Sequence, residues 1–239
     1  MKVFARTDIG KVRPINEDSF YLPGEGENFC AIADGMGGHN AGEVASAMAV
    51  EFFSGKMRGA AVSGAAMREA VEGANRAVFE KSLEANQLSG MGTTFTALAV
   101  SGNNVHIAHV GDSRAYLLRN GSIMRLTLDH TLVEEMVLQG VITPREAKHH
   151  PKRNYITRAL GTAEYVEVDL IQIELQPGDV FFLCSDGLSN HVEDKKILEI
   201  CRMDSGWNEK VSMVVDAALE NGGSDNITAL FAMCEEDHK

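Results

Sequence analysis

Apolar residues recur at every third or fourth position in two stretches of the first third of the chain. Val44, Met48 and Phe52 predict a helix over residues 41–53 with one apolar face. A helical spacing of four, three and four residues predicts a second, longer helix that ends before Gly90, with apolar positions at Met67, Val71, Ala74 and Val78. The two helices follow each other closely and form a predicted pair.

Short apolar runs predict the strands. Residues 29–33 form a continuous apolar run, which predicts a buried strand that ends at Asp34. After Gly92 the helical period disappears. Four strand-like runs follow, over residues 93–100, 105–110, 115–119 and 122–126. Because Gly-Asn and Gly-Asp turns separate these runs, we expect them to form an antiparallel meander.

In the second half of the chain, stretches with helical spacing alternate with short strand-like runs. Helices are predicted over residues 132–139, 193–201 and 208–219, and strands over residues 167–173, 180–184 and 226–233. Residues 143–146, Thr-Pro-Arg-Glu, have the pattern of a capping box with proline at the first helical position, which predicts a helix start there.

Adjacent strands with helices segregated in pairs favour an α+β fold over a parallel doubly wound sheet. We expect two packed antiparallel β-sheets flanked on both sides by helices, an α-β-β-α sandwich. No linker, repeat or low-complexity tract divides the 239 residues, so one domain over residues 1–239 is expected.

The net charge narrows the function classes. A formal charge of −12 disfavours nucleic acid and anionic membranes as partners. Neither a signal peptide nor a run of about 20 apolar residues is visible, so we expect a soluble, cytoplasmic protein without a membrane span. The excess of Asp and Glu has a second possible explanation, because clustered carboxylates can hold cations.

The cysteines do not indicate a catalytic or metal site. No two of the four are close enough for a CxxC pair, which argues against a zinc knuckle or a redox motif. No arginine stands six positions after Cys30, Cys184 or Cys201, which argues against a cysteine-based phosphatase. Buried free thiols are the expected state.

Four aspartates stand at strand ends beside small turn residues: Asp34 before Gly35, Asp112 after Gly111, Asp186 before Gly187 and Asp225 before Asn226. For each alone, turn formation is the ordinary explanation, as for Asp179 after Gly178. However, a carboxylate at the mouth of a buried strand is costly unless it is paired or metal-bound. Converging carboxylates would repel one another without a cation, and hard divalent ions prefer oxygen ligands.

The glycine-rich turn over residues 35–40 looks like part of a dinucleotide fingerprint. Asn40 stands where the last glycine is required, and no parallel βαβ unit follows, so a nucleotide cofactor is not expected. The glycines could instead let a backbone carbonyl approach a metal ion.

Several motifs in order carry a family resemblance. They are Arg13-x-x-Asn16-Glu17-Asp18, Asp34-Gly35-Met36-Gly37-Gly38-His39, Gly92-Thr93-Thr94, Gly111-Asp112-Ser113-Arg114, Ser185-Asp186-Gly187 and Ser224-Asp225-Asn226-Ile227-Thr228. The set resembles the bacterial type 2C, metal-dependent Ser/Thr protein phosphatases (the PPM family), from about Thr7 to Ala232. Residues 154–161 resemble a further stretch of that family.

The resemblance implies hydrolysis of phosphoserine and phosphothreonine by metal-activated water, with two core Mn²⁺ or Mg²⁺ ions. Asp34 would bridge the two ions, and the carbonyl of Gly35 would bind the second. Asp186 and Asp225 would complete the first site, and Asp112 with Asp186 would hold a weaker third ion. Glu17, Asp18 and Asn226 would support these ligands from outside.

Two further residues receive catalytic roles from the resemblance. Arg13 would grip the substrate phosphate with its planar fork, whereas a purely structural salt bridge is the alternative. His39 stands where the family often has a candidate general acid, which would help a serine alkoxide leave. A surface histidine on a turn is the alternative for this residue.

The resemblance also implies partners. We expect phosphorylated proteins, among them a Ser/Thr kinase of the same cell and its substrates. The segment around residues 140–160, with His149 and His150, would be a flap that contacts substrate or gates the site. A regulator of the same fold that binds phosphoprotein but is catalytically weak is the alternative, and a relative acting on a phosphorylated anti-sigma antagonist or a small phosphate ester is a third. The three first-site carboxylates argue against the regulator.

Overall fold

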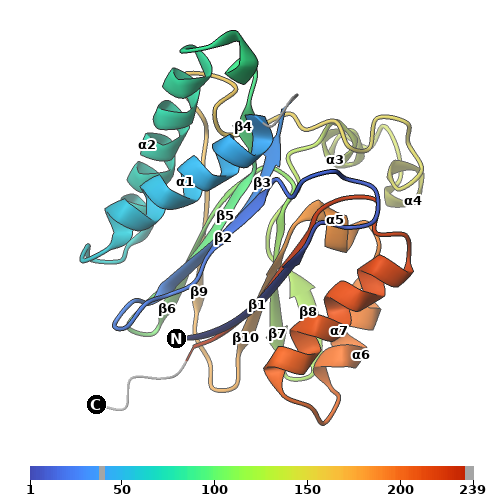
Figure 1. The fold of residues 1–239 in the computed structure, drawn as a ribbon. Coiled ribbons are helices and arrows are strands. Elements are labelled where there is room, and N and C mark those ends of the chain that lie inside the picture. Colours follow the sequence, from blue (N-terminus) through green and yellow to red (C-terminus); the bar gives the residue numbers. More distant parts are fainter. Residues whose placement is uncertain (38–40, 235–239) are drawn as a thin grey trace.

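Two antiparallel sheets packed face to face form the centre of the protein, and helices cover the outer face of each (Figure 1). The structure is a computed structural model, which describes residues 1–37 and 41–234. The first sheet has the order β1 (Lys2–Asp8), β11 (Ile227–Met233), β10 (Val180–Cys184), β7 (Arg114–Arg119) and β8 (Ser122–Arg125). The second has the order β2 (Asp18–Tyr21), β3 (Phe29–Met36), β5 (Phe95–Ser101), β6 (Asn104–Val110) and β9 (Asp169–Glu174), with β4 (Gly92–Thr93) beside β3. The expected α-β-β-α sandwich is confirmed.

The alternation of side chains along β10 shows why both faces of its sheet are buried. Phe181 and Leu183 point into the core between the sheets, whereas Val180, Phe182 and Cys184 pack under the outer helices. A strand that is buried on both faces appears in the sequence as a continuous run of apolar residues. The predicted boundaries of this strand are confirmed.

The helices form the two outer layers. The pair α1 (Ala41–Met57) and α2 (Gly64–Ser82) covers the second sheet (Figure 1). The first sheet is covered by α5 (Asp186–Ser189), α6 (Asp194–Cys201) and α7 (Trp207–Glu220). A short 3₁₀ helix over Asn86–Leu88 follows α2. No helix in the described ranges is long and apolar enough to cross a membrane.

The buried face of α1 differs from the predicted one. Ala41, Ala45, Ala49 and Phe53 are fully buried, whereas Val44, Met48 and Phe52 are partly exposed at the edge of the core. Small alanines let the helix approach the sheet closely, which the spacing of large residues could not reveal. Phe52 instead packs toward α2, where a side chain on Gly73 would lie 2.5 Å from its ring. The predicted face of α2 is confirmed.

The predicted meander is wrong at Gly111. Strands β5 and β6 pair in the second sheet, and β7 and β8 pair in the first, so the chain crosses between the sheets over residues 111–113. On its other side, β6 pairs with β9, which lies about 60 residues further along the chain. Gly111 makes this crossing with a φ of +108°, a value that favours glycine.

The segment between β8 and β9 carries α3 (Leu132–Leu138) and α4 (Pro144–Ala147). Thr143 and Glu146 form the predicted capping box at the start of α4, and both reciprocal hydrogen bonds are present. Figure 1 shows α3 and α4 at the same end of the sandwich as α5 and β4.

Candidate metal centre

Asp34 lies on β3 rather than beyond it, because the strand continues through Gly35 to Met36. Its neighbour across the sheet is Asp18 of β2. The backbone of Asp34 is fixed from the other side, since its N–H donates to Thr94 Oγ1 and its carbonyl accepts from the Thr94 N–H, both at 2.9 Å. The strand therefore holds two carboxylates side by side at the end of the second sheet.

Asp18 links the two sheets. Its Oδ2 accepts hydrogen bonds from Thr228 Oγ1 at 2.6 Å and Ser185 Oγ at 2.9 Å, both of the first sheet's strand ends. Its Oδ1 is buried and has no hydrogen-bond partner in the described part of the chain. Burial raises the pKa of Asp18 to about 7, although the two hydroxyl bonds oppose this shift.

Asp186 and Asp225 come from neighbouring strand ends of the first sheet. Asp186 is the first residue of α5, separated from the end of β10 by one residue, and its Oδ2 accepts from Asn190 Nδ2 at 3.1 Å. Asp225 precedes β11. Its Oδ1 accepts the N–H of Asn226 at 2.8 Å, and its Oδ2 accepts from Arg13 Nη2 at 2.8 Å.

Asn226 holds the loop over residues 9–17. Its Nδ2 donates to the carbonyls of Ile9 and Ile15, each at 2.9 Å, and its Oδ1 accepts the N–H of Glu17 at 2.8 Å. Both N–H bonds and the oxygen of the side-chain amide are thus engaged with one loop. Asn226 positions the loop that carries Arg13 and Glu17.

The charges of these carboxylates raise one another's pKa. Burial raises the pKa of Asp34 well above its ordinary value, and the charges of four other aspartates, Asp18, Asp186, Asp112 and Asp225, add to this. Burial and the charge of Asp186 do the same for Asp112. Burial and the charge of Asp225 raise the pKa of Asp186. The structure therefore brings the predicted aspartates together.

The donor set fits divalent cations that prefer oxygen. Asp112 Oδ1, like Asp18 Oδ1, is buried without a hydrogen-bond partner in the described residues. No group of three His, Cys, Asp or Glu side chains between residues 1–37 and 41–234 is arranged to hold a metal ion as it stands. Mg²⁺ usually keeps several waters and takes only one or two carboxylates per ion, so the spread of these aspartates fits such ions.

Comparison with known proteins identifies the family. The family model described as Protein phosphatase 2C matches residues 13–229. The chain belongs to the protein phosphatase 2C family. It is 42% identical to the serine/threonine protein phosphatase PstP of Mycobacterium tuberculosis over 235 residues, which cover 97% of this chain and 45% of PstP. It therefore spans about half the length of that relative.

A second relative of this 2C family chain has a similar length. The serine/threonine phosphatase Stp of Listeria monocytogenes is 38% identical, and the match covers 95% of this chain and 93% of Stp. The crystal structure of the PstP catalytic domain in complex with two manganese ions matches with a TM-score of 0.87 at 40% identity, and covers 96% of each chain.

Gly35 has a steric role that the sequence analysis did not anticipate. A Cβ on Gly35 would lie 2.1 Å from the carbonyl oxygen of Gly42 at the start of α1, and 2.6 Å from the carbonyl oxygen of Glu17. A Cβ on Gly42 would in turn lie 2.4 Å from Glu17 Oε1. The two glycines let α1, β3 and the side chain of Glu17 converge beside Asp34.

The structure places one of the two residues that were predicted to be catalytic, and both roles stay predictions. Arg13 lies beside the aspartates, with Nη2 on Asp225 and Nη1 3.9 Å from Glu17 Oε2. Its side chain is 45% exposed, so one edge of the guanidinium stays open to solvent. His39 lies outside the described residues, and its role as a general acid stays a prediction.

Two histidines that the sequence analysis left out also position this site. His191 Nδ1 donates to the carbonyl of Gly187 at 2.9 Å, and His191 Nε2 accepts from Ser224 Oγ at 3.1 Å. The imidazole thus joins the residue after Asp186 to the residue before Asp225. Its only sequence signal is the spacing of four from Gly187, which is the spacing of one helical turn.

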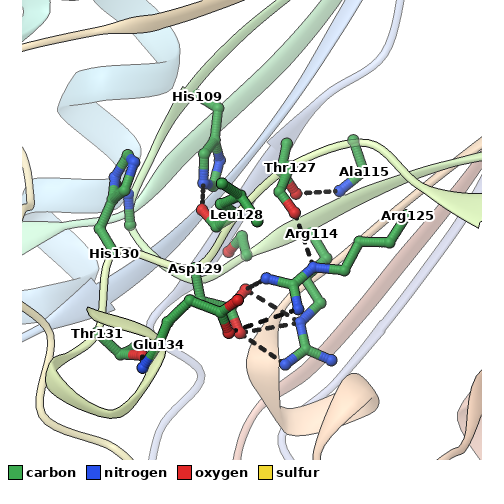
Figure 2. A network of polar contacts seen from close by, with 12 residues as sticks. His109, Arg114, Ala115, Arg125, Thr127, Leu128, Asp129, His130, Thr131 and Glu134 are labelled. Carbon is green, nitrogen blue, oxygen red and sulfur yellow. Dashed lines mark hydrogen bonds and ion pairs between the residues drawn. The ribbon is translucent and has the colours of Figure 1, made fainter. Parts of the chain in front are cut away.

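His130 plays a similar part beside Asp112. The ring Nδ1 of His130 accepts a hydrogen bond from the backbone N–H of Gly111 at 3.0 Å, and the backbone N–H of His130 donates to the Gly111 carbonyl at 2.8 Å. Figure 2 shows His130 next to His109, whose Nε2 donates to the carbonyl of Leu128 at 3.0 Å. A lone histidine in a polar stretch gave no signal of this contact.

An ion-pair network anchors the loop before His130 (Figure 2). Asp129 accepts a hydrogen bond from Arg114 Nη2 at 2.6 Å and forms an ion pair with Arg125 Nη2, also at 2.6 Å. Arg125 also lies 3.9 Å from Glu134 at the start of α3. Because Arg114 follows the crossing over residues 111–113, the network fixes the segment that carries Asp112.

Gly187 offers a test of how tightly the site is packed. A Cβ there would lie 2.0 Å from the carbonyl oxygen of Asn226, so Gly187→Ala must push α5 away from β11. We expect a loss of about 3 kcal/mol in the free energy of unfolding, typical of a strained core substitution. Gly55→Ala, in α1 with open space around the Cβ, is the control and should stabilise by about 0.5–1 kcal/mol. Urea unfolding of both variants measures this, and equal stabilities would contradict the packing described.

Proposed function

We propose that the chain hydrolyses phosphoserine and phosphothreonine in proteins with the help of Mn²⁺ or Mg²⁺ ions. The observation that carries the proposal is the convergence of four aspartates from both sheets at one end of the sandwich, in a chain of the 2C family. A PstP catalytic domain of the same fold was crystallised with two manganese ions. Mutual repulsion of these carboxylates is relieved by divalent cations, which supports the same conclusion.

Each aspartate has a proposed part. Asp34, Asp186 and Asp225 would hold the two core ions together with the carbonyl of Gly35, and Asp112 with Asp186 would hold a weaker third ion. Glu17, Asp18 and Asn226 hold these ligands in place from outside. When bound, the ions supply positive charge for the phosphate and lower the pKa of a coordinated water.

Arg13 is proposed to bind the substrate phosphate. Its guanidinium is held at the site by Asp225 and Glu17, and its open edge can donate a pair of hydrogen bonds to phosphate oxygens. Asn226 keeps this loop in place through the carbonyls of Ile9 and Ile15. His39 is the proposed donor of a proton to the leaving alkoxide.

The proposed partners are phosphorylated proteins, among them a Ser/Thr kinase of the same cell and its substrates. In this proposal residues 1–239 form one catalytic domain, and the segment around residues 140–160 is a flap beside the metal centre. A catalytically weak phosphoprotein-binding regulator is the alternative. The presence of Asp34, Asp186 and Asp225 speaks against it.

Hydrolysis of para-nitrophenyl phosphate and of a phosphothreonine peptide tests the proposal directly. Purified protein is assayed with Mn²⁺, with Mg²⁺ and with EDTA. Release of phosphate that needs the metal and stops in EDTA is the expected result. Absence of turnover with either metal, in protein shown to be folded by circular dichroism, would favour the regulator.

Replacement of Arg13 with alanine separates phosphate binding from chemistry. We expect a loss of about 1.5–3 kcal/mol in binding, seen mainly as a higher KM, because a charge-assisted hydrogen bond is removed. Steady-state kinetics on a phosphothreonine peptide measures this. A fall in kcat with an unchanged KM would contradict the proposed role of Arg13.

A further inference from the structure

The flap carries a concentration of positive charge in an acidic chain. Residues 144–158 contain five Lys or Arg residues and only Glu146 as an acidic residue, in a chain whose net charge is −12. Arg145, Lys148, Lys152 and Arg153 are exposed. Such a local reversal of sign can attract and orient an anionic partner.

Most of these cations have no strong ion pair in the part of the chain that the structure describes. Lys148 Nζ lies 3.8 Å from Glu193 Oε1, but both side chains are largely exposed, so this pair is weak. Within the described residues, Arg145, Lys152 and Arg153 have no ion pair with a carboxylate. Arg158 differs, because it pairs with Asp169 at 2.7 Å and with Glu167 at 3.4 Å, which gives it a structural role.

The basic segment is tied to the metal centre at its carboxyl end. The N–H of Thr157 donates to the carbonyl of His130 at 2.8 Å, and His130 binds Gly111, next to Asp112. Leu160 exchanges backbone hydrogen bonds of 2.9 and 3.0 Å with Thr93, next to Thr94, which binds Asp34. The exposed cations therefore lie on a segment whose carboxyl end is held beside the proposed metal centre.

The segment is also locally ordered. The capping box at Thr143 fixes the start of α4, and backbone hydrogen bonds from His149, His150 and Arg153 continue as turns. Tyr155, next to this basic run, exposes 62% of its surface. A structured surface with cations and an exposed aromatic ring suits a peptide better than a free ion.

We propose that residues 145–155 form a docking surface for acidic side chains, Asp or Glu, that flank the phosphorylated residue of a protein substrate. The proposal rests on the proposed phosphatase function and assigns its substrate class. The phosphate occupies the metal centre, and the flanking carboxylates pair with Arg145, Lys152 and Arg153. The acidic remainder of the chain repels long polyanions, which favours an acidic peptide over nucleic acid.

The test compares two phosphothreonine peptides of equal length, one with flanking glutamates and one with flanking glutamines. The variant Arg145→Glu/Arg153→Glu reverses two flap charges. The matched control Arg68→Glu/Arg76→Glu reverses two exposed charges on α2. In the Mn²⁺-loaded protein we expect the flap variant to lower kcat/KM about tenfold for the glutamate peptide and less than twofold for the glutamine peptide. Tenfold is about 1.4 kcal/mol, which two or three exposed ion pairs can supply.

Three further results test the proposed docking surface. The preference of the wild-type protein for the glutamate peptide should fade at 0.5 M salt, because exposed charges are screened. Equal losses on both peptides, or the same loss in the α2 control, would overturn the docking surface. So would tighter binding of a single-stranded DNA oligonucleotide than of the glutamate peptide.

Fluorescence anisotropy in EDTA separates this proposal from the proposed function. The glutamate peptide should bind the wild-type protein more tightly than the flap variant even without turnover. Hydrolysis of both peptides without any preference in rate or binding would refute the docking surface and leave the phosphatase intact. Binding preference without hydrolysis under any metal would refute the phosphatase and support the surface.

Discussion

Asp186→Asn should lower the turnover of a phosphothreonine peptide at least about a thousandfold while the fold persists. The proposed centre uses Asp186 for up to two ions, so the change removes one negative charge from both. A thousandfold loss corresponds to about 4 kcal/mol of transition-state stabilisation, a reasonable contribution for a misplaced metal ion. The fold should persist because asparagine has the same shape, and the contact with Asn190 is a single hydrogen bond of 3.1 Å.

The matched control is Asp204→Asn, an exposed aspartate between α6 and α7 that loses the same charge. Its kinetics should equal those of the wild type. Isothermal titration with Mn²⁺ shows whether the metal still binds the Asp186 variant. Wild-type turnover in that variant, with the metal bound, would overturn the assignment of Asp186.

The aspartates that we propose as metal ligands were accessible to sequence reasoning because of their surroundings. Asp34 and Asp186 follow apolar runs that are buried on both faces, and a carboxylate in that place needs an explanation beyond a turn. Gly178-Asp179 has a similar local sequence, with an aspartate beside a glycine. In the structure Asp179 accepts from Arg119 and from the N–H of Gln176, which is the turn role expected of it.

The features that the sequence did not predict have two physical causes, which are pairing with a distant strand and partial burial. The local sequence does not distinguish a turn within one sheet from the crossing at Gly111. The difference lies in distant pairing, because β6 pairs with β9 and β7 pairs with β10. The strand Asp18–Tyr21 and the strand Lys2–Asp8 were not predicted. Their burial is partial, so neither shows a clean alternation.

The same limit applies to the residues that hold the site from outside. Asn226 and His191 act through backbone carbonyls, which any residue type at the partner position would provide. The family resemblance placed Asn226 near the ligands without explaining its contacts. The structure supplies the reason, which is three hydrogen bonds to one loop.

The metal-free protein should become less stable as the pH rises from about 4 to about 7. Burial and mutual repulsion raise the pKa values of Asp34, Asp112 and Asp186, and burial raises that of Asp18 to about 7. A carboxyl group with a raised folded-state pKa keeps its proton in the folded protein while the unfolded chain ionises above 3.8. Its contribution to stability is complete below the unfolded pKa and is lost as the pH rises through the folded pKa.

Histidines oppose this trend. Burial lowers the pKa of His109 to about 4 and also lowers that of His130, so both contribute stability at high pH that is lost as the pH falls. The comparison of Mn²⁺ with EDTA at each pH removes this common contribution, because neither histidine belongs to the proposed ligands. Each pKa unit is worth about 1.4 kcal/mol, so the carboxylate effect can dominate between pH 5 and 8.

Thermal unfolding at pH 5.5 and pH 8, in Mn²⁺ and in EDTA, measures the effect. At pH 8 a metal concentration of about 100 Kd should add about 2.7 kcal/mol, or roughly 5–10 °C in Tm for a chain of this size. At pH 5.5 the gain should be much smaller, because the carboxyl groups hold protons that the metal must displace. Asp18→Asn should flatten the pH dependence in EDTA. A Tm gain from Mn²⁺ that is equal at both pH values would show that these aspartates do not carry the raised pKa values, and the cation would then have to bind elsewhere.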